Sequence, residues 1–149
     1  MIILDTDFAP WEGERPTGRV QFSVYDERVL KYVISGCIDK TLLDVYASIH
    51  EPALQKIKQE GGRWYAMFVF KNVTEVTDEA LDAIYHYLTD LKEKRLLSQY
   101  SALVFPNEMT ISKDKQLAFM ECFNKAGACC KSFDRESVAL DWLFSCSLS

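Results

Sequence analysis

The first regular pattern in the chain is an alternation of apolar and polar residues in the segment RVQFSVY at 19–25. Val20, Phe22 and Val24 alternate there with polar neighbours, which is typical of a β-strand that buries one face and exposes the other. A second run rich in apolar residues, VLKYVISG at 29–36, follows after a short polar turn. Two strands joined by so short a turn favour an antiparallel hairpin.

The apolar period changes after the hairpin and predicts an amphipathic helix at 40–59. Apolar residues recur there at steps of three and four, which places them on one face of a helix. The residues expected to face inward are Leu42, Tyr46, Ile49, Ala53 and Ile57. Asp39 suits the N-cap position, and the pair Gly61–Gly62 ends the helix. Pro52 should kink this helix or split it into two pieces, because its ring clashes with the preceding turn.

Strands and helices alternate in the rest of the chain. The predicted strands are 63–70, 100–105 and 128–133, and the predicted helices are 78–95, 112–126 and one that starts at about 135. The residues expected to face inward are Leu81, Ile84, Leu88 and Leu91, then Leu117, Met120 and Phe123, and finally Val138, Ala139, Trp142 and Leu143. Strands joined through a helix pair in parallel. The order β-β-α-β-α-β-α-β-α therefore predicts an α/β fold, with a mixed, mostly parallel sheet of about five strands and about four helices.

The first 17 residues do not fit this pattern. We predict that 1–17 forms an N-terminal arm and that 18–149 forms the domain. Proline and glycine at three positions interrupt any regular element in the arm. Phe8 and Trp11 give it apolar side chains, which can contact the domain, a partner subunit or a ligand.

Composition and charge narrow the class of protein. The net charge of −5 over 149 residues argues against a nucleic-acid binder, which needs clustered Lys and Arg to neutralise phosphates. No apolar run approaches the roughly 20 residues that a membrane-spanning helix needs. The N-terminus also lacks the basic and apolar regions of a signal peptide. We therefore expect a cytoplasmic protein that binds no nucleic acid and does not span a membrane.

The residue types used in catalysis are present, but not in the spacing that catalysis or metal binding requires. The five cysteines include no Cys-x-x-Cys pair, and His50 and His86 have no second ligand at helical spacing. Both histidines are expected at the surface or its boundary, with Asp82 one turn from His86. Three carboxylate pairs, Asp5/Asp7, Glu12/Glu14 and Asp26/Glu27, are expected in loops or in the arm, where solvent leaves their pKa values ordinary. We expect no metal, no cofactor and no enzymatic activity; an enzyme, if it were one, would be thiol-based.

The segment KNVTEVTDEALDAI at 71–84 lies where a predicted strand leads into a predicted helix. Thr77 suits the N-cap, and Asp78 and Glu79 complement the positive end of the helix dipole. A phosphate on Thr74 or Thr77 would be repelled by these carboxylates and by Glu75. Three interpretations remain open: a self-capped helix start, a docking surface in which Asp78 supplies a permanent negative charge, or a phosphoacceptor threonine.

Three segments carry a resemblance to a known family: GRVQFSVYDERVLKYVISGCID, RWYAMFVFKNVTEVTDEAL and FDRESVALDWL. With them the chain resembles the STAS domain of sulfate transporters and anti-sigma-factor antagonists, and more narrowly the bacterial SpoIIAA-like family, over about 18–145. In anti-sigma antagonists, a phosphorylatable serine follows an aspartate at the start of the helix after the central strand. That pair falls on Thr77 and Asp78, and no serine is present there.

The resemblance implies a non-enzymatic STAS-like regulatory or interaction module without the usual phosphoacceptor serine. Its partner would be another protein or, in a homodimer, a second copy of the chain. The residues expected to form the interaction site are Thr74, Glu75, Thr77, Asp78 and Glu79. The alternative is a small-molecule or lipid-binding protein that uses an apolar sheet face under the N-terminal arm. The grouping of this fold with the CRAL-TRIO lipid carriers implies an apolar ligand in that case.

Overall fold

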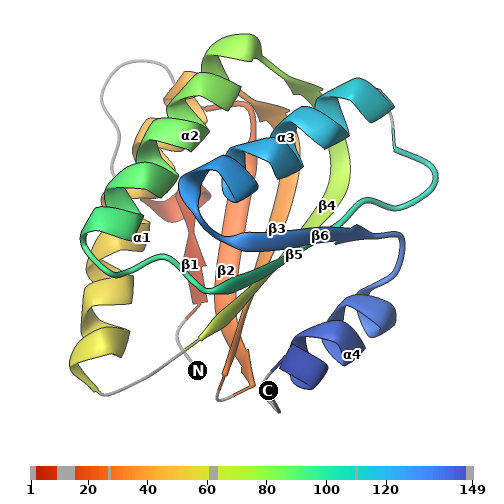
Figure 1. Cartoon of the computed structure of the whole chain (residues 1–149). Coiled ribbons are helices and arrows are strands. Elements are labelled where there is room, and N and C mark those ends of the chain that lie inside the picture. Colours follow the sequence, from red (N-terminus) through yellow and green to blue (C-terminus); the bar gives the residue numbers. More distant parts are fainter. Residues whose placement is uncertain (1–2, 10–15, 27, 61–63, 110, 147–149) are drawn as a thin grey trace.

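The computed structural model describes residues 3–9, 16–26, 28–60, 64–109 and 111–146 (Figure 1). Its strands are β1 (Ile3–Asp5), β2 (Arg19–Asp26), β3 (Val29–Ile38), β4 (Tyr65–Val76), β5 (Tyr100–Val104) and β6 (Cys129–Phe133). Its helices are α1 (Lys40–Gln59), α2 (Asp78–Glu93), α3 (Lys113–Ala126) and α4 (Glu136–Cys146), and Thr6–Phe8 form a short 3-10 helix, η1.

The strands form one mixed sheet in the order β1-β2-β3-β4-β5-β6. β1, β2 and β3 pair antiparallel, and β3, β4, β5 and β6 pair in parallel. The predicted hairpin, the mixed sheet and the four helices are thereby confirmed. The sheet described has 6 strands rather than about five, because Ile3–Asp5 of the predicted arm pairs with β2 of the same chain. The boundary between arm and domain at 17/18 stays a prediction.

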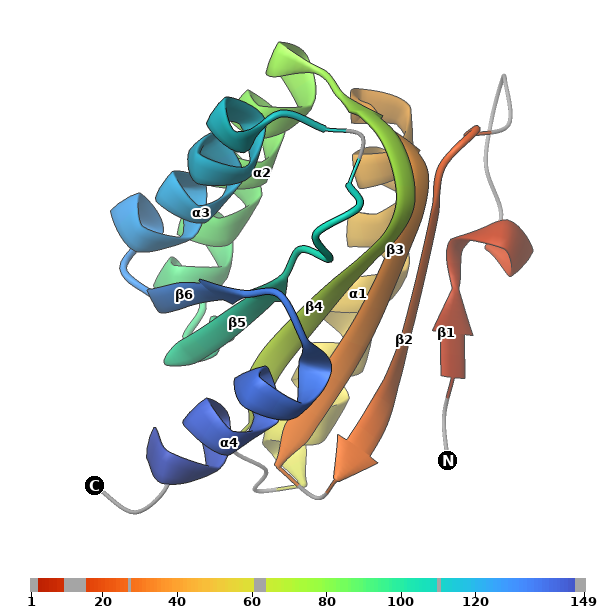
Figure 2. The ribbon, with the colours of Figure 1, turned by 90° about the vertical axis from the view of Figure 1, so that its right-hand side faces the viewer.

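Helices cover the two faces of the sheet unequally, as the two views of the ribbon show (Figures 1 and 2). α1, α2 and α3 pack on one face, where the larger hydrophobic cluster lies. α4 packs on the other face through Ala139 and Leu143, which contact buried residues of β3, β4 and β5. Neighbouring residues of a strand point to opposite faces. Phe68 therefore belongs to the larger cluster, while Met67 lies under α4.

The helices have the predicted positions, but some of them turn a different face to the core. α1 continues through Pro52 as one helix instead of splitting there. The buried residues of α1 are Leu42, Val45, Tyr46, His50 and Leu54, while the expected Ile49, Ala53 and Ile57 are only partly buried. Leu117 of α3 is 57% exposed, because Phe119, Phe123 and Ala126 face the sheet instead. Val138 of α4 is likewise exposed, because the neighbouring Ala139 and Leu143 face the sheet instead.

β4 continues six residues beyond the predicted end at Phe70 and so carries the chain directly to α2. The extension was missed because its buried residues, Val73 and Val76, stand three apart instead of alternating. The pairing with β3 explains this spacing, since its register shifts between Ile34 and Gly36 and again after Gly36. Such bulges leave extra residues unpaired and turn side chains to the other face. Gly36 adopts a positive φ of 77°, and a Cβ there would lie 2.8 Å from the Thr17 carbonyl oxygen.

Candidate functional site

The carboxyl end of β4 and the first turn of α2 form a surface that we call the junction surface: Thr74, Glu75, Thr77, Asp78 and Glu79. Thr77 is the N-cap of α2, as expected, and its Oγ1 accepts a hydrogen bond from the Ala80 backbone N–H at 3.0 Å. The Thr77 backbone N–H donates in turn to the Ile38 carbonyl oxygen of β3 at 3.1 Å. The start of α2 is therefore fixed to the sheet on one side and capped on the other.

Asp78 exposes a carboxylate on this surface. Its side chain is 95% exposed and forms an ion pair of 2.5 Å with Lys115 of α3. The hydrogen bond from Lys115 holds the pKa of Asp78 below its usual value. Asp78 therefore stays charged near neutral pH. Glu79 follows it in the first turn of α2 and is also exposed.

The structure brings most of the predicted site residues together around one shallow recess. Thr74, Glu75, Thr77 and Asp78 line it. Ile111 and Lys115, which the sequence analysis did not single out, complete the wall. The parallel pairing of β4 with β5 placed them there, because it brings the segment after β5 and the start of α3 next to the start of α2 (Figure 1).

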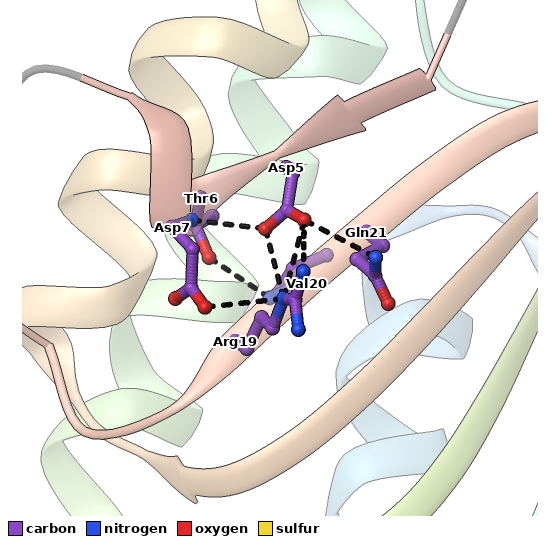
Figure 3. Close-up of polar contacts among 6 residues, drawn as sticks. All are labelled: Asp5, Thr6, Asp7, Arg19, Val20 and Gln21. Carbon is purple, nitrogen blue, oxygen red and sulfur yellow. Dashed lines mark hydrogen bonds and ion pairs between the residues drawn. The ribbon is translucent and has the colours of Figure 1, made fainter.

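The described part of the arm lies at the edge of the sheet, beside β2 (Figures 2 and 3). Phe8, which was expected to contact the domain, a partner subunit or a ligand, is 83% exposed. Trp11 lies outside the described residues. The described arm residues add an edge strand and a short helix, and Leu4 packs against the larger hydrophobic cluster. On the face away from α1, apolar side chains lie under α4, while Arg19 and Gln21 of β2 meet the arm. On the α1 side of the sheet, Leu4 lines a mostly apolar groove together with residues of β2, β3 and α1, and a ligand under the arm stays a prediction.

Asp5 holds this edge strand to β2 and corrects the prediction that it would be a solvated carboxylate (Figure 3). The Arg19 guanidinium donates to both carboxylate oxygens of Asp5, and Gln21 Nε2 donates to one of them at 3.1 Å. The Asp7 backbone N–H adds a third donor at 2.9 Å. Burial raises the pKa of Asp5, but these donors and the Arg19 charge outweigh burial, so the pKa lies below its usual value. The neighbouring Thr6 Oγ1 accepts from the Val20 N–H at 3.0 Å.

The prediction that His50 lies at the surface or its boundary is wrong. Its side chain lies in the core, with only 3% of the residue exposed. The Nε2 atom lies 2.7 Å from the Tyr32 hydroxyl, and Nδ1 lies 2.6 Å from the Tyr87 hydroxyl. Burial lowers the pKa of His50 to about 3, so the ring is neutral. His86 is exposed, 3.6 Å from Asp82, as predicted.

Four of the five cysteines have surroundings that disfavour covalent chemistry. Burial raises the pKa of four thiols, those of Cys37, Cys122, Cys130 and Cys146. A thiol of raised pKa is a poor nucleophile near neutrality. In the part of the chain that the structure describes, no group of three His, Cys, Asp or Glu side chains is placed to hold a metal ion. None of the described helices combines the length and apolar character that crossing a membrane requires.

Two solved structures resemble the chain over most of its length. The anti-sigma factor antagonist SpoIIAA in its unphosphorylated form covers 83% of this chain with 96% of its own, at 11% identity and a TM-score of 0.53. An uncharacterised DUF3478-family protein from Shewanella loihica PV-4, with a SpoIIAA-like fold, covers 90% with 99% of its own, at 14% identity and a TM-score of 0.57. No protein-family model and no curated protein matches the sequence. The chain therefore has the SpoIIAA-like fold of the STAS domains.

Proposed function

We propose that this chain is a non-enzymatic STAS-like module that binds another protein through the junction surface. One observation carries the proposal: the Asp78 carboxylate is exposed at the tip of a capped helix start, where the chain holds it in place with Thr77 and Lys115. The similar structure SpoIIAA is an antagonist of an anti-sigma factor, and thus acts on another protein. Fold likeness alone does not identify the partner, so the partner has to be inferred from the surface itself.

The charge of the junction surface indicates the kind of partner. Glu75, Asp78 and Glu79 are all exposed, and Lys115 is the cation paired with one of them. A surface with excess negative charge favours a partner with a basic patch, since complementary charge speeds association and excludes wrong partners. A second copy of this chain would have to bring basic residues from elsewhere on its surface, because two junction surfaces repel each other.

The same residues favour binding that does not depend on phosphorylation of the junction surface. The Thr77 hydroxyl is already an acceptor in the cap of α2. A phosphate there would add negative charge next to Glu75, Asp78 and Glu79, which would repel it. Asp78 supplies a negative charge without modification. The proposed module is therefore constitutively active, and its activity depends on the amount of protein present.

Capture of partners with three forms of the protein tests the proposal. The immobilised wild type is compared with Asp78→Lys, which reverses the key charge, and with Asp44→Lys, which reverses another exposed carboxylate, on α1, that also pairs with a lysine. We expect a protein that is retained by the wild type and by Asp44→Lys and lost from Asp78→Lys. Equal retention by all three forms, or no specific retention by the wild type, would contradict the proposal.

A further inference from the structure

An apolar groove opens to solvent between α1 and the first three strands of the sheet. Its volume is about 470 Å³, which lies within the range of small-molecule binding sites. The strand side of the groove includes Leu4, Phe22, Val24 and Leu30, from β1, β2 and β3. Leu4 pairs with Phe22, and Val24 pairs with Leu30. Paired residues share a face of the sheet, so these four side chains form one continuous apolar surface.

The helix side of the groove is a row of apolar residues that α1 leaves outside the core. Ile49, Ala53 and Ile57 line the groove and stand four residues apart, so they follow one another along one face of α1 over about 12 Å. They are only partly buried, because His50 and Leu54 face the sheet instead. Apolar side chains that gather at an open groove, rather than being exposed singly, indicate a binding site.

Two opposite charges, Lys56 and Glu60, complete the lining of the groove. They stand four residues apart on α1, a spacing at which opposite charges on a helix can meet. Three other pairs with this spacing form ion pairs in the described helices: Lys40–Asp44, Asp90–Lys94 and Glu121–Lys125. Within the described residues, the side chains of Lys56 and Glu60 form no ion pair with each other or with a third residue. Both charges are therefore available to a ligand.

The two charges indicate which polar group the ligand carries. A purely anionic group beside Lys56 would also meet Glu60, and a purely cationic group beside Glu60 would also meet Lys56. A group that holds one negative and one positive charge is complementary to both residues. The head of an α-amino acid has a carboxylate and an ammonium on the same carbon atom, and an apolar side chain starts from that carbon.

We propose that this groove binds a free apolar α-amino acid. Its side chain lies between the apolar row of α1 and the strands, its carboxylate on Lys56 and its ammonium on Glu60. An engineered cavity of about 150 Å³ binds benzene, so a groove of about 470 Å³ has room for the largest apolar side chains, those of phenylalanine and tryptophan. The groove shares no residue with the recess of the junction surface, so a failure of one proposal leaves the other standing.

Three probes with the same phenyl group test the two charged contacts separately. They are L-phenylalanine, 3-phenylpropanoate, which lacks the ammonium, and 2-phenylethylammonium, which lacks the carboxylate. Each is titrated into the full chain and followed in amide NMR spectra, and L-phenylalanine should give saturable shift changes at the residues of the groove. L-alanine has the same head without the phenyl group, and should bind about tenfold more weakly or less well still, as expected for the loss of a buried aromatic ring.

Substitutions of the two charged residues should act on different probes. Lys56→Gln should weaken L-phenylalanine and 3-phenylpropanoate about threefold, as expected for one exposed ion pair, and should not weaken 2-phenylethylammonium. Glu60→Gln should weaken L-phenylalanine and 2-phenylethylammonium by a similar factor and should not weaken 3-phenylpropanoate. Lys40→Gln removes a charge of α1 that lies outside the groove, and should change the binding of none of the probes.

Two matched substitutions locate the site. Ala53 lines the groove, whereas Ala47 is a partly buried residue of the same helix outside it. Ala53→Leu should fill part of the groove and weaken all three probes, and Ala47→Leu should weaken none. The proposal is overturned if the wild type shows no saturable shifts at the groove or if L-phenylalanine binds no more tightly than both probes that lack one of its charges. It is also overturned if Lys56→Gln and Glu60→Gln affect all three probes alike, or if Ala47→Leu has the same effect as Ala53→Leu.

Discussion

His50 makes the stability of the protein depend on pH in a window where its carboxylates contribute little. The folded state holds the ring neutral, with a pKa of about 3, whereas an unfolded histidine has a pKa of about 6.5. Between these values the unfolded state binds more protons than the folded state, so stability falls as the pH drops below 6.5. At pH 5 the unfolded state gains RT ln(1 + 10^1.5), or about 2 kcal/mol, relative to pH 8.

Urea unfolding at pH 8 and pH 5, followed by tryptophan fluorescence, measures this loss. The chain has 2 histidines, so the comparison is clean: His50→Gln removes the buried ring and His86→Gln removes the exposed one. The wild type and His86→Gln should each lose about 2 kcal/mol more than His50→Gln on going from pH 8 to pH 5. The change with pH is compared, and not the absolute stability, because His50→Gln also alters packing. If His50→Gln showed the same pH dependence as the wild type, the assignment of a buried neutral His50 would be refuted.

Three further substitutions test local features by the same urea unfolding. Thr77→Ala should cost about 1 kcal/mol of stability through loss of the α2 N-cap, and Thr77→Ser should cost much less, since serine caps equally well. Gly127→Ala should destabilise by about 1 kcal/mol or more, because Gly127 ends α3 with a φ of 104° and its new Cβ would lie 3.3 Å from Lys92. Asp5→Asn should cost about 1–3 kcal/mol, because it removes the charged acceptor of Arg19 and leaves the amide facing a guanidinium. A value near zero for any of these would remove the corresponding structural argument.

The elements with strong periodicity were predictable. The α1 segment, 40–59, shows apolar steps of three and four with Asp39 in front, and its helix has the predicted bounds, with the Asp39 side chain accepting from Leu42 N–H. Gly127 ends α3 as expected, in the left-handed conformation that glycine adopts without strain. Local patterns decide these features, so they can be read without knowledge of tertiary contacts.

Features that depend on distant partners were not predictable. β1 has three residues and is a strand only because β2 offers an edge and Arg19 binds Asp5. His50 stands beside Ile49 in sequence, but its burial depends on hydroxyls from β3 and α2. Its spacing of four from both Tyr46 and Leu54 was a usable signal, since it completes an apolar stripe with them.

Only the local part of the junction surface, the capped start of α2, could be predicted from the sequence. Thr77, Asp78 and Glu79 show the composition of a capped helix start, and the cap is present. Lys115 lies 37 residues away and meets Asp78 only because β4 and β5 pair in parallel and α3 returns over the sheet. No local pattern predicts that ion pair.

A photo-crosslinking amino acid placed in the junction surface shows whether this surface binds a partner. One form carries it at Glu75, exposed at the end of β4, and the control carries it at Asp141, exposed on α4 away from the junction. We expect illumination in the cells of the natural host to give a protein adduct from position 75 and none from position 141. The adduct mass distinguishes another protein from a second copy of the chain. Adducts at position 141 alone, or at neither position, would contradict binding through the junction surface.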